Sequence, residues 1–291
     1  WGMHDYTREG AQGCTSFNEI IAKGYGEPQS AKEFACLAQW VNYDGHRSLF
    51  ESRSQNRKGL LMWMSHSCWP SMVWQTYDYY FEPTAAYFAI KKASEPLHIQ
   101  WNPATDEVEV VNYSAGTHKG LTAKVQVLNM DASVAWEKEA TVDSNEDTTD
   151  KCIKLEFPEN LSKVHFIKMT LTEDGKVVSD NFYHRSLEEN NYQDLRQLAK
   201  VALQTTTTVD KNADGTWSAV SVVENKTSTP ALMIRLNVVG NKDGQQLLPV
   251  FYSDNYFSLL PGEKKEVRMS WKDEDTRGNE GEVLITGYNV E

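Results

Sequence analysis

The stretch FIKMTLTEDGKVVSDNFY, Phe166 to Tyr183, indicates the fold class of most of the chain. Two runs rich in β-branched, aromatic and other apolar residues, 166–172 and 177–183, flank the tetrapeptide Glu173-Asp-Gly-Lys176. An Asp-Gly pair between two such runs favours a tight turn, because these residues accept the positive φ angles that the turn needs. The stretch therefore predicts a β-hairpin.

Similar runs extend the pattern upstream of this hairpin. They occupy residues 97–101, 108–112, 121–128, 133–140 and 152–157. Several short strands at this spacing are typical of a β-sandwich. We therefore expect an immunoglobulin-like sandwich over residues 96–188.

A second series of strand-type runs follows the polar segment 186–194. The runs occupy residues 201–209, 217–223, 232–239, 247–252, 266–271 and 283–288. The pairs Asp214-Gly215 and Asp243-Gly244 indicate hairpin turns between them. This series predicts a second all-β sandwich over residues 189–291.

Residues 1–95 have a different character. Ser30-Ala-Lys-Glu33 has the form of a capping box, and the residues behind it predict a helix over about 31–53. The continuous apolar run 60–64 is typical of a strand buried on both faces, and Pro83 favours a helix reaching about Lys92. This order is that of an α/β protein, but 95 residues are too few for a (β/α)8 barrel of about 250 residues.

Composition excludes several classes of partner. The chain has 291 residues and a formal net charge of −12, which argues against nucleic acid and against a basic membrane-binding surface. It has no apolar run of about 18 residues, so we expect no membrane-spanning helix. The four cysteines lack metal-type spacing, and we expect neither a metal nor a cofactor. Because the chain begins at Trp1 without an initiator methionine, we expect further sequence upstream.

Large aromatic residues are concentrated in residues 62–81, MWMSHSCWPSMVWQTYDYYF. Aromatic rings with a polar group suit a site that is apolar on one side and polar on the other. Sugars are such ligands, because their C–H faces lie on aromatic rings while their hydroxyls make hydrogen bonds. The segment therefore points to a carbohydrate.

Three parts of this region resemble glycoside hydrolase family 2. They are GLLMWMSHSCWP at residues 59–70, WQTYD at 74–78 and AYFAIKKASEPLH at 86–98. Within the family they are most similar to the branch of exo-β-D-glucosaminidases and plant endo-β-mannosidases, and DNYFSLLPGE at 254–263 resembles the last sandwich of that branch.

This resemblance implies that residues 1–95 are the terminal part of a (β/α)8 TIM barrel. Residues 60–64 would be its eighth strand, residues 83–93 its closing helix, and the two sandwiches would follow. Family members are retaining glycosidases with two catalytic carboxylates, which would lie upstream of Trp1. The implied substrates are β-linked glucosamine or mannose glycans, and the implied partner is the upstream part of the same polypeptide. A periplasmic or secreted location suits such an enzyme.

The resemblance also implies which residues contact the sugar. Trp63, Ser65, His66 and Trp69 would follow strand eight, at the end of the barrel where active sites lie. The alternatives are that Trp63 fills the barrel and that His66 is a hydrogen-bonded loop residue. Ser and His at positions 65 and 66 depart from the Asn or Asp found near there in relatives, which leaves the sugar contact open.

Other residues of this region are weaker candidates. His4 and Asp5 would lie in the loop after strand seven and within reach of the substrate. Tyr77, Asp78 and Trp74 are expected to brace the aromatic loop.

Two carboxylate pairs within the chain have helical spacing: Asp5 with Glu9, and Asp78 with Glu82. With 41 acidic residues such spacing arises by chance, so we expect no catalytic residue here. A different class of function also fits the sequence. The sandwiches would then be a carbohydrate-binding or structural module without catalysis.

Overall fold

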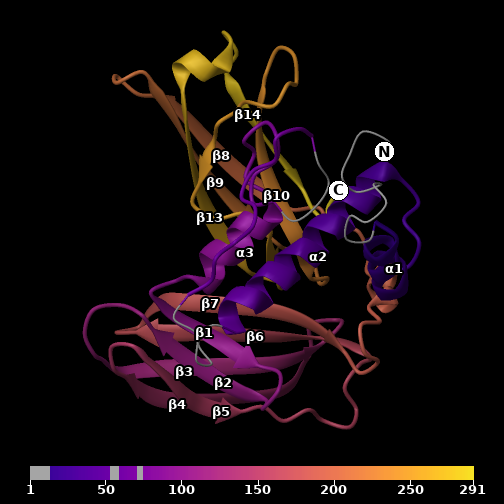
Figure 1. The fold of residues 1–291 in the computed structure, drawn as a ribbon, viewed down its shortest axis with the longest axis vertical. Helices are drawn as coiled ribbons and strands as arrows, with labels where there is room; N and C mark the ends of the chain where they lie inside the picture. The colour runs from indigo at the N-terminus through magenta and orange to yellow at the C-terminus, as the bar shows by residue number, and fades with distance from the viewer. Residues whose placement is uncertain (1–13, 53–58, 71–74) are drawn as a thin grey trace. The chain divides into compact units, whose positions relative to one another are not determined.

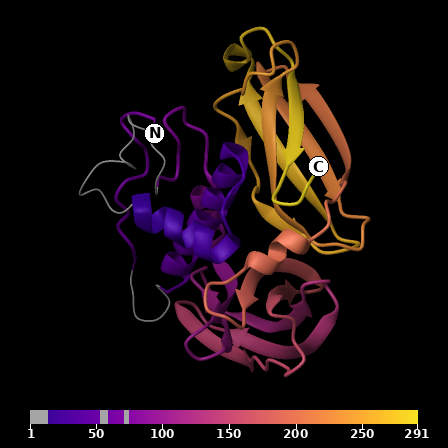
Figure 2. The same cartoon turned by 90° about the vertical axis from the view of Figure 1, so that its right-hand side faces the viewer.

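The computed structural model describes residues 14–52, 59–70 and 75–291. The earlier candidates His4, Asp5, Glu9 and Trp74 lie outside the described residues. Strands dominate the described chain, and most of its helical residues precede them (Figures 1 and 2). The chain forms two compact units. The first unit contains residues 1–44, 62–88 and 197–291, and the second contains residues 45–61 and 89–196.

The α-helices are α1 (Cys14–Tyr25), α2 (Ala31–Glu51) and α3 (Ala85–Ala93). The predicted capping box at the start of α2 is confirmed in modified form. The Glu33 N–H donates to Ser30 Oγ at 3.1 Å, and the Glu33 carboxylate accepts the N–H of Gln29 at 2.7 Å. No helix in the described part of the chain is long and apolar enough to cross a membrane.

The first sandwich lies in the second unit. Its strands are β1 (Leu97–Asn102), β2 (Glu107–Asn112), β3 (His118–Asn129), β4 (Val134–Ser144), β5 (Thr148–Lys154), β6 (Val164–Glu173) and β7 (Lys176–Ser186). Each strand predicted for this region has a counterpart, although the run expected over 152–157 is a strand only as far as Lys154, at the end of β5. One sheet has the order β1-β2-β5 and the other β4-β3-β6-β7. At the β6–β7 turn, Asp174 and Gly175 have φ angles of 49° and 75°, as the Asp-Gly pair predicts.

Alternation along the strands builds the core of this sandwich. Val125, Val127, Met169 and Leu171 point inward from β3 and β6, and each is fully buried. Ile99 meets them from the other sheet. Because side chains alternate between the two faces of a strand, the intervening polar residues face outward.

The second sandwich lies in the first unit. Its strands are β8 (Gln204–Lys211), β9 (Thr216–Glu224), β10 (Ala231–Gly240), β11 (Phe251–Tyr252), β12 (Phe257–Leu259), β13 (Lys264–Lys272) and β14 (Gly281–Thr286). One sheet has the order β11-β13-β9-β8 and the other β12-β10-β14.

Two predictions for the second sandwich need correction. Of the expected strand 247–252, only Phe251–Tyr252 is a strand, β11. Leu247 instead makes a single backbone hydrogen bond to β10, in which its N–H donates to Val238 O at 2.9 Å. Strand β12 was not predicted. It has three residues, which is too short to show an alternating pattern.

The strand expected over 60–64 does not form in the described chain. The segment has no regular secondary structure, and Leu61 and Trp63 are exposed. A strand requires a neighbour that pairs with its N–H and C=O groups. No described residue pairs with 60–64. The described chain is thus mostly β, with two immunoglobulin-like sandwiches and few helices, and it contains no barrel.

Candidate functional site

The described parts of the aromatic loop, residues 62–70 and 75–84 of the first unit, are joined by hydrogen bonds. Ser65 O accepts the N–H groups of Thr76 and Tyr77 at 3.1 and 2.9 Å, and the Thr76 hydroxyl at 3.0 Å. The Thr84 hydroxyl donates to Gln75 O and Thr76 O at 3.0 and 3.1 Å. These bonds hold Ser65 and the start of α3 to the same short segment.

His66 lies against the aromatic residues at the far end of this loop. Its ring stacks on Phe81, with centroids 4.3 Å apart and planes at 13°, and lies 6.5 Å from the Tyr79 ring at 11°. Its Nε2 atom is 3.3 Å from Tyr79 O. The stacking fixes the plane of the imidazole. Tyr79 and Phe81 were not among the predicted site residues, although the aromatic run in which they lie was evident.

Asp78 shapes the turn that presents Phe81. Its Oδ1 atom accepts the N–H groups of Tyr80 and Glu82 at 2.8 and 2.9 Å. Phe81 has a φ of +67°, which is uncommon for a residue other than glycine. Burial raises the pKa of Asp78, while the two backbone N–H groups act in the opposite direction. Glu82 forms an ion pair with Arg235 of β10. Both carboxylates therefore hold the loop, as expected of Asp78.

Three of the four predicted sugar-contact residues are exposed. Trp63 is 83% exposed and Trp69 is 46% exposed, and the Ser65 side chain also faces solvent. His66 is partly buried against Phe81. Among the described contacts, none joins Trp63 to Trp69 or to His66. The loop thus presents separate aromatic surfaces around a fixed imidazole.

Comparison with known proteins bears on both sandwiches. Residues 181–290 match the exo-β-D-glucosaminidase Ig-fold domain, and residues 106–186 match the mannosidase Ig/CBM-like domain. The chain carries Ig-fold domains of glycoside hydrolase family 2. The resemblance noted in the sequence is therefore confirmed.

Individual family-2 relatives match nearly the whole chain. An exo-β-D-glucosaminidase of Streptomyces avermitilis is 31% identical over 94% of the chain, and a mannosylglycoprotein endo-β-mannosidase of Lilium longiflorum is 24% identical over 99%. The crystal structure of Amycolatopsis orientalis exo-chitosanase CsxA matches 98% of the chain at 28% identity, with a TM-score of 0.92. The chain spans about a third of each relative: 34%, 37% and 37%.

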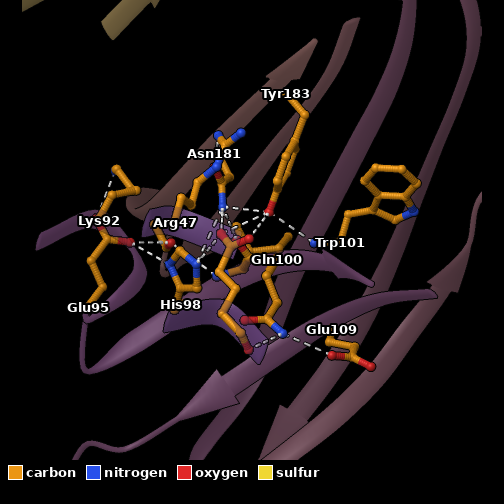
Figure 3. A network of polar contacts seen from close by, with 12 residues as sticks. Arg47, Lys92, Glu95, His98, Gln100, Trp101, Glu109, Asn181 and Tyr183 are labelled. Carbon is orange, nitrogen blue, oxygen red and sulfur yellow. Dashed lines mark hydrogen bonds and ion pairs between the residues drawn. The ribbon is translucent and has the colours of Figure 1, made fainter. Parts of the chain in front are cut away.

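The second unit contains buried carboxylates. Glu51 accepts hydrogen bonds from the Tyr183 hydroxyl at 2.9 Å and Asn181 Nδ2 at 2.8 Å, and its Oε1 atom is 3.2 Å from His98 Nε2. His98 Nδ1 is 3.1 Å from Glu95. Figure 3 shows His98, Asn181 and Tyr183 converging in this network. Glu51 lies 130 positions from Asn181, 132 from Tyr183 and 47 from His98, so sequence spacing gave no signal for their meeting.

Within this buried network, electrostatic interactions shift the pKa values of His98 and Glu95. Burial alone would lower the pKa of His98, but the hydrogen bonds and charges of Glu51 and Glu95 outweigh it, and the pKa is raised. Burial acts to raise the pKa of Glu95, but His98 and Lys92 outweigh it, and that pKa is lowered. Glu51 and His98 are 6% and 1% exposed, which leaves no face for a sugar. We therefore interpret the network as structural.

The shifted pKa of His98 predicts a pH dependence for the second unit. Because the pKa of His98 is raised by folding, protonated His98 stabilises the fold. This stabilisation is fully present below the pKa of histidine in the unfolded chain, about 6.5, and is lost as pH rises through the pKa of His98 in the folded state. We expect the midpoint of unfolding to fall as pH rises above about 6.5. Hydrogen exchange of peptides from 97–112 and 164–186 monitors this transition. In His98→Gln this alkaline decline should vanish. A wild-type midpoint that rises over the same range would contradict the assignment.

Proposed function

We propose that this chain is the C-terminal part of a retaining glycoside hydrolase that acts on β-glucosaminides or β-mannosides. The observation that carries the proposal is the alignment of 94% of the chain with an exo-β-D-glucosaminidase at 31% identity. Residues 1–95 are assigned to the end of the catalytic barrel, and residues 96–188 and 189–291 to accessory sandwiches. A glycan-degrading role suits a periplasmic or secreted location.

The exposed apolar segment 60–64 supports the assignment to a barrel. Leu61 and Trp63 are among the most exposed large apolar side chains of the described chain, and such exposure usually marks a surface that another element covers. In the whole enzyme the neighbouring strands of a barrel would pair with this segment. It would then be the eighth strand.

The sugar-contact residues of the proposal are Trp63, Ser65, His66 and Trp69. Trp63 offers an open indole face for the C–H surface of a sugar ring. Ser65 and His66 offer hydrogen-bonding groups, and stacking on Phe81 holds the imidazole in one plane.

The catalytic carboxylates are assigned to the upstream part of the enzyme. A retaining glycosidase needs two carboxyl groups about 5–5.5 Å apart, one protonated and one ionised. Asp78 accepts two backbone hydrogen bonds and Glu82 is paired with Arg235, so neither is set up for that task. The chain alone should therefore release no product from chromogenic β-glucosaminides or β-mannosides. Turnover lost on changing Asp78 or Glu82 would place the chemistry here and overturn the assignment.

Replacing Trp63 tests the sugar platform. In the full-length enzyme, Trp63→Ala is expected to lower kcat/KM by about tenfold to a hundredfold, because the loss of apolar contact costs about 1.5–3 kcal/mol. The matched control is Tyr113→Ala, since Tyr113 is an exposed aromatic residue of the first sandwich. Equal kcat/KM values for Trp63→Ala and wild type would remove Trp63 from the site.

A second candidate function is carbohydrate binding without catalysis. It is favoured by the match of residues 106–186 to a domain described as Ig/CBM-like. Titration of the chain with chitosan and manno-oligosaccharides distinguishes the two. Saturable binding that persists in Trp63→Ala would favour the binding module, whereas binding that depends on Trp63 would favour the platform.

A further inference from the structure

Strand β8 (Gln204–Lys211) has one open backbone edge within the first unit. It is the last strand of the sheet β11-β13-β9-β8, and β9 is its one neighbour in that sheet. No described residue outside β9 forms a backbone hydrogen bond with β8. The side chains of Gln204–Thr208 are all exposed, so neither face of the strand is covered there. The edge is therefore accessible to another strand.

The pairing with β9 determines which backbone groups of β8 point outward. One residue beyond β8, and in register with the β8–β9 pairs, the Asn212 N–H donates to Thr216 O at 2.8 Å. Bonded and non-bonded pairs alternate along an antiparallel ladder, so the even-numbered residues of β8 direct their N–H and C=O groups toward β9. The odd-numbered residues direct theirs toward the open edge: Thr205, Thr207 and Val209.

Several other sheet edges of the described chain carry features that hinder pairing, and β8 lacks these features. Strands β11 and β12 have only two and three residues, and β4 carries the charged run Glu137-Lys-Glu139. Strand β8 has eight residues, contains no proline or glycine, and pairs with β9 without a register shift. Its Thr205–Thr208 run favours an extended backbone. An exposed edge of this kind is a template for a further strand.

The sequence of β8 is complementary to itself in an antiparallel register. With a two-fold axis between the two copies of Thr207, the outward backbone groups of Thr207 face those of the partner's Thr207. The outward groups of Thr205 then face those of the partner's Val209. On the opposite face, the Gln204 amide lies opposite the carboxylate of the partner's Asp210. Polar pairs of this kind across two strands stabilise a sheet.

The charges on β8 also suit a second copy. Asp210 and Lys211 are the charged residues of the strand, and Lys211 forms an ion pair with Asp273 at 2.8 Å. Asp210 is therefore the charge that an added strand must accommodate. In the two-fold register it meets an uncharged amide, and no like charges lie opposite each other.

We propose that this chain forms a two-fold dimer in which β8 pairs antiparallel with β8 of a second copy. The pairing joins the two β11-β13-β9-β8 sheets into one continuous sheet. One surface patch serves both copies, as two-fold symmetry requires. The contact is confined to one strand from each copy, so the dissociation constant is expected on the order of 100 µM. This proposal is independent of the glycosidase assignment.

Sedimentation equilibrium of this chain from about 1 µM to 1 mM tests the dimer. Thr207→Pro removes an outward N–H group without removing a bond to β9, and proline is tolerated at such edge positions. It should raise the dissociation constant at least about tenfold. The matched control is Thr207→Val, which also loses the 2.8 Å contact between the Thr207 and Ser221 hydroxyls but keeps the N–H group. It should keep the wild-type dissociation constant.

Cysteine cross-linking tests the register and serves if Thr207→Pro fails to fold. The two Thr207 Cα atoms of the dimer would lie about 5.5 Å apart, which a disulfide can span. Thr205→Cys is the matched control on the same face, because its two copies would lie roughly 14 Å apart. Both variants also carry Cys68→Ser, since Cys68 is exposed. With oxidised glutathione, we expect a disulfide-linked dimer from Thr207→Cys and none from Thr205→Cys.

Four results would overturn the proposal. One is a monomer over the whole concentration range, and another is equal cross-linking of the two cysteine variants. The third is association that persists in Thr207→Pro; if it is then lost in Leu61→Asp, the contact lies at the exposed segment 60–64. The fourth is protection of the outward amides of 204–211 from hydrogen exchange in a monomeric full-length enzyme, because another segment of that enzyme would then occupy the edge.

Discussion

Replacing Glu51 by alanine is expected to destabilise the second unit by about 3–5 kcal/mol, as for removal of one partner from a buried ion pair. Glu51 is 6% exposed and accepts from Tyr183 and Asn181, with His98 at 3.2 Å. Its loss leaves these donors buried without their acceptor and removes one of the two carboxylates that stabilise the imidazolium of His98. The change in the free energy of unfolding is measured by urea unfolding, monitored through hydrogen exchange of peptides from the first sandwich.

The matched control for this prediction is Glu188→Ala. Glu188 forms an exposed ion pair with Lys163 at 2.9 Å, and exposed pairs contribute little to stability. Its loss should leave the urea midpoint unchanged. Glu51→Gln retains one acceptor oxygen and should fall between Glu51→Ala and wild type. If Glu51→Ala unfolds at the wild-type urea concentration, the network does not support the fold.

Replacing Trp271 by alanine is expected to destabilise the second sandwich by about 3–5 kcal/mol. Trp271 lies on β13, is 2% exposed, and stacks on Trp217 with ring centroids 6.4 Å apart and planes at 5°. Gly281 lies directly against its ring, and a Cβ at that position would clash with it. Alanine would leave a cavity that the surrounding strands fill only in part.

Hydrogen exchange of peptides from 216–224 and 264–272 during urea unfolding measures this change. The control is Phe251→Ala, because Phe251 lies on the neighbouring strand β11 and is 68% exposed. It should shift the midpoint far less than Trp271→Ala. Equal shifts for the two variants would mean that burial of Trp271 does not determine the stability of this sandwich.

Local sequence by itself determined the strands of the first sandwich and the start of α2. Asp174-Gly175 sets the β6–β7 turn of the first sandwich through the φ angles of these two adjacent residues. Ser30 and Glu33 cap the start of α2 within one helical turn. Such signals act over a few positions, so they are readable without the fold. The likeness to glycoside hydrolase family 2 was also evident from short motifs.

Tertiary structure alone decided the rest. In the buried network, Glu51 meets His98 and Tyr183 from 47 and 132 positions away, and the ion pair of Glu82 with Arg235 spans an even longer separation. The run 60–64 has the composition of a buried strand but no strand pairs with it in the described chain. Whether an apolar run becomes a strand, and which polar side chains meet, depends on partners distant in sequence, because a strand's hydrogen bonds and a buried charge's compensation come from other segments.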